Sequence, residues 1–298
     1  MGAASLSRTP NPDEPVPRVA LPALCLLAGG IALWTASTVL YLGGTLAWWA
    51  TIPINAACSY ALFTVAHDAS HHSLASAKAT NDWLGRLATP FIAPFVGFRG
   101  WRFIHMQHHR FTNHHDGSDP DDYTNRGPGW QAPLRWLTID CWYVVFYVPR
   151  FAGRPRAERL EVLATLGFVA AAMVIVIATG NLVALLVVYL IPVRAAIFFL
   201  GFAFDYLPHH GLSRTPQEDR FKTTRLRVGK ERLLSPVLLY QNYHLVHHLH
   251  PIVPFHRYVA VWLRGEQGYL EHGPELCTPV GRPLTPEEYR RLREPSGP

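Results

Sequence analysis

Long apolar runs without charged residues alternate along the chain with polar segments. Each run is long enough to cross a hydrocarbon core of about 30 Å as a helix. Tight Gly/Asn-containing turns join them in pairs. The pattern predicts an all-α integral membrane protein with four transmembrane helices in two hairpins. The expected spans are 19–42 with 46–66, and 162–179 with 182–207.

Charge is distributed unevenly between the spans and the other segments. Of the 27 lysines and arginines, all but Arg194 lie outside the four runs, and the turns within the two hairpins carry none. Because basic residues gather on the cytoplasmic side, we expect both termini and the long central loop to face the cytoplasm. A charge inside a span is costly and usually faces protein or water. Arg194 therefore has either a functional role or a structural one, as a snorkelling or helix-contacting side chain.

The polar segments are predicted to form a helical cap and two tails. Residues 1–18 are proline-rich and read as a disordered tail, and 279–298 as a flexible tail, which leaves 19–278 as a single domain. Within the loop, 87–98 is apolar but short and broken by prolines, so it is expected in the membrane interface or dipping into it. Residues 137–148 predict an amphipathic helix on the bilayer surface.

Composition supports a membrane protein and not a nucleic-acid-binding one. Hydrophobic residues make up 49% and charged residues 16%, and the formal charge of +6 is not arranged as a basic stripe with interleaved aromatics. The four cysteines are isolated, so the sequence indicates neither a disulfide framework nor a thiolate metal site. We therefore expect no nucleic acid as partner.

Histidine is the residue type that points to chemistry. Fourteen of the sixteen histidines lie in four clusters, which the topology places at one membrane face. Residues three and four apart share one face of a helix, so an H-x-x-H-H sequence aims three imidazoles at one point. Two such boxes and one H-x-x-x-H pair predict a metal site for two ions. Its histidines are His67 and His71; His105, His108 and His109; and His244, His247 and His248.

Ligand type narrows the class of metal site. Imidazole suits zinc, copper, nickel and iron, and a single zinc ion needs only about four ligands. The chain contains no H-E-x-x-H of zinc proteases and no E-x-x-H of carboxylate-bridged di-iron bundles. What remains is a dinuclear site made of histidine alone. His72 lies off the helical face of His67 and His71 and is not expected to be a ligand. His114 and His115 are expected in a solvated turn, and His250, His256 and His272 are expected to be structural.

On these residues the chain resembles the membrane fatty acid desaturase family of di-iron enzymes, from about Ala66 to Pro254. The resemblance rests on three boxes in order: His67-Asp-Ala-Ser-His71, His105-Met-Gln-His-His109 and Gln241-Asn-Tyr-His-Leu-Val-His-His-Leu249. The first and third boxes are also similar to the carotenoid β-ring hydroxylases of the cyanobacterial type.

The resemblance implies that the eight box histidines bind two iron ions. It also implies a ninth ligand after the second hairpin, which here is His209 or His210. Asp205, one turn earlier, is expected to orient His209, and Asp68 is expected to support the first box. The family further implies O2 as co-substrate and two electrons from a separate ferredoxin- or cytochrome-type donor with its reductase.

Four functions compete. A fatty acyl desaturase stands first, on family size alone, and a carotenoid β-ring hydroxylase stands second; both oxidise an unactivated C–H bond of a lipid in the bilayer. A histidine-rich metal transporter or metal-binding protein would need polar groups within the spans, where Arg194 and Asp205 are the charged residues. A structural membrane protein would leave the spacing of the boxes unexplained.

Overall fold

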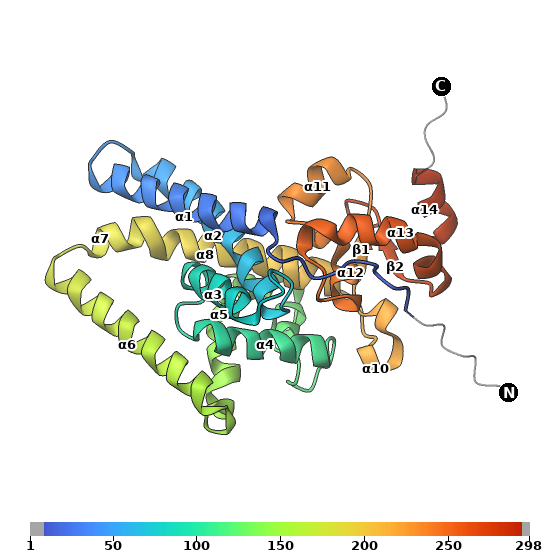
Figure 1. Ribbon diagram of the computed structural model, residues 1–298, viewed down its shortest axis with the longest axis horizontal. Helices are drawn as coiled ribbons and strands as arrows, with labels where there is room; N and C mark the ends of the chain where they lie inside the picture. The colour runs from blue at the N-terminus through green and yellow to red at the C-terminus, as the bar shows by residue number, and fades with distance from the viewer. Residues whose placement is uncertain (1–8, 294–298) are drawn as a thin grey trace.

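The computed structural model describes residues 9–293 of the chain (Figure 1). Within that part, four helices are long and apolar enough to cross a membrane, which confirms the predicted fold class. They are α1 (Leu21–Leu42), α2 (Trp48–Ser70), α6 (Arg156–Ala178) and a nearly continuous helix Leu182–His209, which we call the fourth span.

The two predicted hairpins differ in how they pack. Helices α1 and α2 lie side by side, and α2 also packs against the fourth span. Helix α6 instead diverges from the fourth span beyond the turn at Gly180 (Figure 1) and packs on α4 (Gly97–Phe111). The second pair is therefore joined by a turn without forming a close-packed hairpin.

The fourth span is not a uniform α-helix. It consists of α7 (Leu182–Leu185), a π-helical segment η5 (Leu186–Leu190), α8 (Ile191–Leu200), a second π-helical segment η6 (Gly201–Tyr206) and α9 (Leu207–His209). A π-helical turn adds a residue and changes which side chains lie above one another.

The loop between the hairpins forms short helices beneath the spans. After α2 come α3 (Lys78–Ala88), η1 (Thr89–Phe91), α4, η2 (Asp121–Asn125), η3 (Gly129–Gln131), α5 (Ala132–Tyr147) and η4 (Val148–Gly153). The proline-broken stretch 87–98 contains the end of α3, the single turn η1 and the start of α4. Helix α5, expected on the bilayer surface, packs against α8.

The C-terminal region completes the cap. It contains α10 (Pro216–Asp219), η7 (Arg220–Lys222), β1 (Arg225–Arg227), α11 (Glu231–Val237), η8 (Gln241–Tyr243), α12 (His244–Leu249), η9 (Phe255–Arg257), α13 (Tyr258–Glu271), β2 (Glu275–Cys277), β3 (Pro283–Leu284) and α14 (Pro286–Arg293). Strand β2 pairs parallel with β1 and antiparallel with β3.

The described parts of both predicted tails contact the cap. In residues 9–18, the carboxylate of Glu14 pairs with Arg264 of α13 at 2.6 Å, and Pro17 accepts a backbone hydrogen bond from Ser76 at 2.8 Å. At the other end, Tyr289 of α14 is 1% exposed and accepts a hydrogen bond from the Trp262 indole at 2.7 Å. Charged and aromatic side chains in the described parts of these segments therefore find partners on α13. Disorder at 9–18 and flexibility at 279–293 stay predictions. The rest of both predicted tails, 1–8 and 294–298, lies outside the described residues.

Candidate metal centre

Eight buried or nearly buried histidines gather in two groups at the cap end of the spans. Within each group, one ring nitrogen of every histidine lies within 4.8 Å of the others. The first group is His67, His71, His105 and His247, and the second is His108, His209, His244 and His248. The structure thus brings together segments separated by up to 181 residues, as the box pattern predicts.

His109 lies between the two groups. Its Nε2 is 2.9 Å from Nε2 of His247 in the first group, and its ring stacks on His248 of the second at 4.3 Å between centroids. The two groups and His109 together contain all eight histidines of the boxes, and His209 is the ninth histidine of the cluster.

Helix geometry positions these side chains. Helix α2 runs to Ser70, so its last turn carries His67 and His71 into the cap, where α4 presents the second box along one face. Gly85 of α3 allows this approach, because a Cβ there would lie 2.3 Å from the Phe98 ring of α4 and 2.7 Å from Ala69 of α2. The close contact of three helices brings the first two boxes together.

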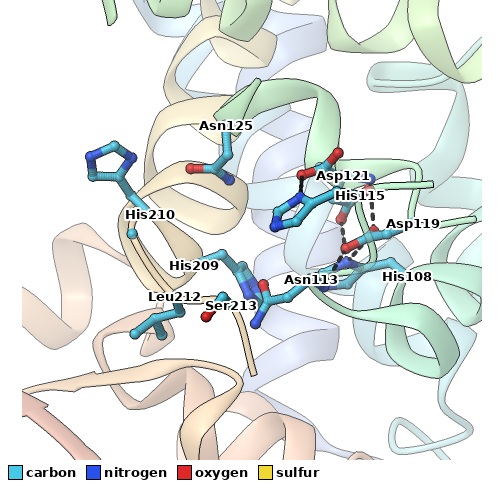
Figure 2. Close-up of a pocket in the computed structure, with 12 residues that line it drawn as sticks. His108, Asn113, His115, Asp119, Asp121, Asn125, His209, His210, Leu212 and Ser213 are labelled. Carbon is cyan, nitrogen blue, oxygen red and sulfur yellow. Dashed lines mark hydrogen bonds and ion pairs between the residues drawn. The ribbon is translucent and has the colours of Figure 1, made fainter. Parts of the chain in front are cut away.

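The structure distinguishes His209 from His210. His209 is buried, and its ring lies 4.9 Å from that of His108 and 5.1 Å from that of His244. His210 follows the last helical residue, is exposed and stacks on Tyr206 at 4.3 Å; Figure 2 shows it pointing away from the cluster. His209 is therefore the one of the two that can share an ion with the boxes.

Hydrogen bonds on the outer side of the cluster set the ring tautomers. The Nδ1–H of His108 donates to the Asp119 carboxylate at 2.9 Å, that of His209 to the Thr223 carbonyl at 3.2 Å, and that of His244 to the Gln241 side-chain oxygen at 2.5 Å. Carboxylate and carbonyl oxygens only accept. Nδ1 therefore carries a proton in each of these rings, and in the neutral rings of His209 and His244 Nε2 keeps a lone pair directed into the cluster.

The inner nitrogens face one another at short range. Nε2 of His71 lies 2.8 Å from that of His105, and Nε2 of His244 lies 3.0 Å from that of His248. Among the described residues, Nε2 of His67 and Nε2 of His209 are buried without a hydrogen-bond partner. Two ligand nitrogens about 2.1 Å from one ion and at right angles to each other lie ~3.0 Å apart. The donor set therefore fits two metal ions, each with several imidazole ligands.

Burial favours the neutral, ligand-competent imidazole. It lowers the pKa of His71, His105, His244 and His247, and neighbouring histidines lower each pKa further. His108 differs. Burial disfavours its charged form too, but the carboxylates of Asp121 and Asp119 outweigh burial and raise its pKa to about 9.

Those two carboxylates belong to a loop that the sequence analysis treated as a solvated turn. Asp119 and Asp121 are buried, and Asp119 also accepts from the backbone N–H of Asn113 at 2.9 Å (Figure 2). Asp121 accepts from the Tyr143 hydroxyl at 2.7 Å. The clustered Asp-Pro-Asp-Asp after the second box was the available signal. Gln241, three residues before His244 on the same helical face, was another.

Of the two acidic residues expected to support the boxes, Asp68 lies beside its histidine and Asp205 does not bond to His209. Asp68 lies 3.3 Å from Nδ1 of His67 and also accepts the Phe255 N–H at 2.9 Å, so it ties the first box to the C-terminal region. Asp205 was expected to orient His209, a role that the Thr223 carbonyl takes instead. Asp205 lies within the π-helical segment η6, so α-helical spacing does not apply there. It lines a small cavity beside His67, His108 and His244.

The other histidines have separate partners. His72 lies near Asp82, the exposed His115 pairs with Asp122, and the buried His250 contacts the Tyr269 hydroxyl at 2.8 Å. His272 stacks on Phe221 with ring centroids 3.8 Å apart. These contacts agree with the solvated and structural roles expected from sequence.

The family model described as "Fatty acid desaturase" matches residues 43–278. The chain is 28% identical over 217 residues to the β-carotene ketolase of Paracoccus sp. (strain N81106 / MBIC 01143), covering 70% of this chain and 76% of the ketolase.

Matches to acyl-lipid desaturases are shorter. An sn-1 acyl-lipid omega-3 desaturase (ferredoxin) of Synechocystis sp. (strain ATCC 27184 / PCC 6803 / Kazusa) is 40% identical over 58 residues, or 19% of this chain and 15% of the desaturase. An sn-1 oleoyl-lipid 12-desaturase of the same strain is 31% identical over 122 residues, or 35% of this chain and 34% of that enzyme. The family model spans the histidine boxes and all of the last three spans. The chain therefore belongs to the fatty acid desaturase family.

Proposed function

We propose that this chain is an O2-dependent membrane oxidoreductase that inserts oxygen at a C–H bond of a carotenoid-type hydrocarbon. The observation that carries the proposal is the pair of buried histidine groups, with inner Nε2 atoms that face one another at short range. This donor set lies where membrane helices enter the cap, so it is within reach of a substrate dissolved in the bilayer.

Iron is the metal we assign, because the desaturase family generally uses it and imidazole suits it. His67, His71, His105 and His247 would hold one ion, and His108, His209, His244 and His248 the other, with His109 between them. The bound irons would supply O2 reduction and removal of hydrogen from an unactivated C–H bond.

The protein's own residues contribute position and surroundings. Asp119, Thr223 and Gln241 hold three rings in one orientation and one tautomer. The aromatic rings of Phe63, Trp101 and Phe204 line the apolar side of the cluster and keep water from the reacting carbon. For hydroxylation, one oxygen atom of O2 enters the C–H bond and the other leaves as water, with two electrons and two protons consumed. A second round at the same carbon yields a ketone after loss of water.

The choice of substrate follows from the extent of the matches. From the sequence, an acyl desaturase stands first on family size alone. The ketolase, however, aligns with most of both chains, whereas the desaturases align over segments. We therefore rank carotenoid oxidation first, above acyl desaturation. The higher local identity to the omega-3 desaturase supports acyl desaturation as the second candidate.

We assign the electron supply to a separate small carrier of ferredoxin type, which one relative's name includes. The distribution of lysine and arginine supports a cytoplasmic location for the site and both termini.

The test is expression in a host that makes β-carotene and ordinary membrane lipids, followed by mass spectrometry of both fractions. We expect carotenoids that have gained a hydroxyl or a keto group. They should be absent with His247→Ala, expressed to the same membrane level. New acyl double bonds with unchanged carotenoids would establish the second candidate, and an unchanged profile in both fractions would contradict the proposal.

A further inference from the structure

An apolar cavity of about 530 Å³ lies between α6 and the segment that joins α3 to α4. Its walls include Pro90 and Ala93 on the joining segment, Phe168 and Ala172 on α6, and Tyr189 on the fourth span. Because α6 diverges from the fourth span (Figure 1), this cavity lies between two membrane helices. It therefore faces hydrocarbon and not water.

Two smaller cavities continue from it towards the histidines. The next one, of about 30 Å³, shares Ala93 with the large cavity and is lined by Phe63, Trp101 and Asp205. The last, of about 10 Å³, shares Phe63, Trp101 and Asp205 with the second and is lined by His67, His105, His108 and His244. Shared lining residues place the three cavities in a row from the lipid to the metal centre.

A second, polar cavity also reaches the metal centre. The cavity in Figure 2, of about 370 Å³, is lined by Asn113, Asp119, Asp121, Asn125 and Ser213 among others. Its walls carry carboxylates and amides, which an apolar molecule would desolvate at a cost. His108 and Asp121 line both this polar cavity and the last cavity of the row.

We propose that the α6 cavity, here called the lateral port, admits the substrate directly from the bilayer, and that Ala93 forms its inner neck. The occupant is a long hydrocarbon whose terminal part passes Ala93 and then the Phe63 and Trp101 rings to reach the histidines. This inference rests on the proposed function for the reaction at the end of the path, but not for the path itself.

The Ala93 side chain and the aromatic rings beyond it limit the size of a molecule that can pass the neck. Ala93 contributes only a methyl group between a cavity of about 530 Å³ and one of about 30 Å³. The aromatic rings beyond it pack edge to face, with Phe63 and Trp101 centroids 5.5 Å apart. A larger residue at 93 would close the passage without contacting a ring nitrogen of the metal centre.

The matched variants are Ala93→Phe at the neck and Ala171→Phe on the exposed face of α6 outside the port. We expect Ala93→Phe to lower product formation at least tenfold, at unchanged iron content and melting temperature. We expect Ala171→Phe to leave product formation, iron content and melting temperature at wild-type values. If Ala93→Phe does not fold, Ala93→Val should give an intermediate loss. Wild-type turnover in a folded position-93 variant would overturn the proposal.

A second measurement separates the port from the reaction. Protein reconstituted in phosphatidylcholine vesicles is irradiated with a diazirine-bearing C18 hydrocarbon, and labelled residues are mapped by mass spectrometry. Labelling at Phe63 in wild type and Ala171→Phe, lost in Ala93→Phe, supports the port even if no oxidised carotenoid is ever found. Equal labelling of Phe63 in all three proteins, or none in wild type, would refute the port while leaving the proposed reaction to its own test.

Discussion

Arg194 of the fourth span and Asp140 of α5 form a two-pronged ion pair. Nη1 of Arg194 lies 2.5 Å from Oδ1 of Asp140, Nη2 lies 2.9 Å from Oδ2, and Nη1 also donates to the Leu137 carbonyl at 2.6 Å. The sequence alone is consistent with either a functional role for Arg194 or a role as a snorkelling or helix-contacting side chain. The pairing favours a helix contact, which holds α5 against the membrane helix that carries His209.

Breaking this pair from one side leaves an unpaired charge beside lipid. Asp140→Leu leaves Arg194 unpaired in the fourth span and should cost roughly 2.5 to 3.5 kcal/mol, the penalty of a charge in a transmembrane segment. Arg194→Leu leaves Asp140 of α5 without this partner and should also destabilise the protein. The double variant should lose less than either single change, because no charge remains. Thermal melts of the four proteins in detergent form the double-mutant cycle, and additive losses would show that the pair is energetically unimportant.

The Asp119 carboxylate should control metal retention through His108. Asp119→Ala removes the acceptor for Nδ1–H at 2.9 Å, and loss of such a partner typically costs 10- to 100-fold in metal affinity. Asp119→Asn keeps an acceptor oxygen and should lose less. Iron per chain, measured by plasma mass spectrometry after dialysis against a chelator, reports the effect. Asp116→Asn, on the exposed part of the same loop, is the control and should retain iron.

The neighbours His209 and His210 should differ sharply. His209→Ala removes a buried nitrogen of the second histidine group, so we expect about half of the iron and nearly all turnover to be lost. His210→Ala removes an exposed ring stacked on Tyr206 and should leave both unchanged. Equal losses in the two variants would contradict the assignment of His209.

Two tyrosine–histidine contacts offer a matched comparison. The Tyr258 hydroxyl contacts Nδ1 of His247 at 2.9 Å, and the Tyr269 hydroxyl contacts Nε2 of His250 at 2.8 Å. Both Tyr→Phe changes remove one hydrogen bond, worth about 1 kcal/mol. Only Tyr258→Phe should also reduce iron affinity and turnover. Chelator titration of the two purified variants makes the comparison, and parallel behaviour would mean that Tyr258 has no effect on the ligand ring.

The C-terminal helix should contribute to stability. Tyr289 is 1% exposed and bonded to Trp262, so Tyr289→Ala should cost about 3 to 5 kcal/mol, as for other buried aromatic residues replaced by alanine. The exposed Leu292→Ala on the same helix is the control. A melting temperature unchanged by Tyr289→Ala would contradict this contribution and support the prediction of a flexible tail.

The sequence alone determined the features that depend on local periodicity. The length of the apolar runs is enough to predict four spans, and three- and four-residue spacing is enough to place His105, His108 and His109 on one helical face, because helix geometry is set within a few residues.

Only the tertiary structure decided which distant groups meet. The Thr223 carbonyl reaches His209, Asp119 reaches His108 from a loop that reads as solvated, and Tyr289 finds Trp262. No periodic pattern records such contacts, because each depends on how separately formed helices pack together. The same packing divides eight histidines into two groups, places His209 in one of them, and leaves His210 on the surface.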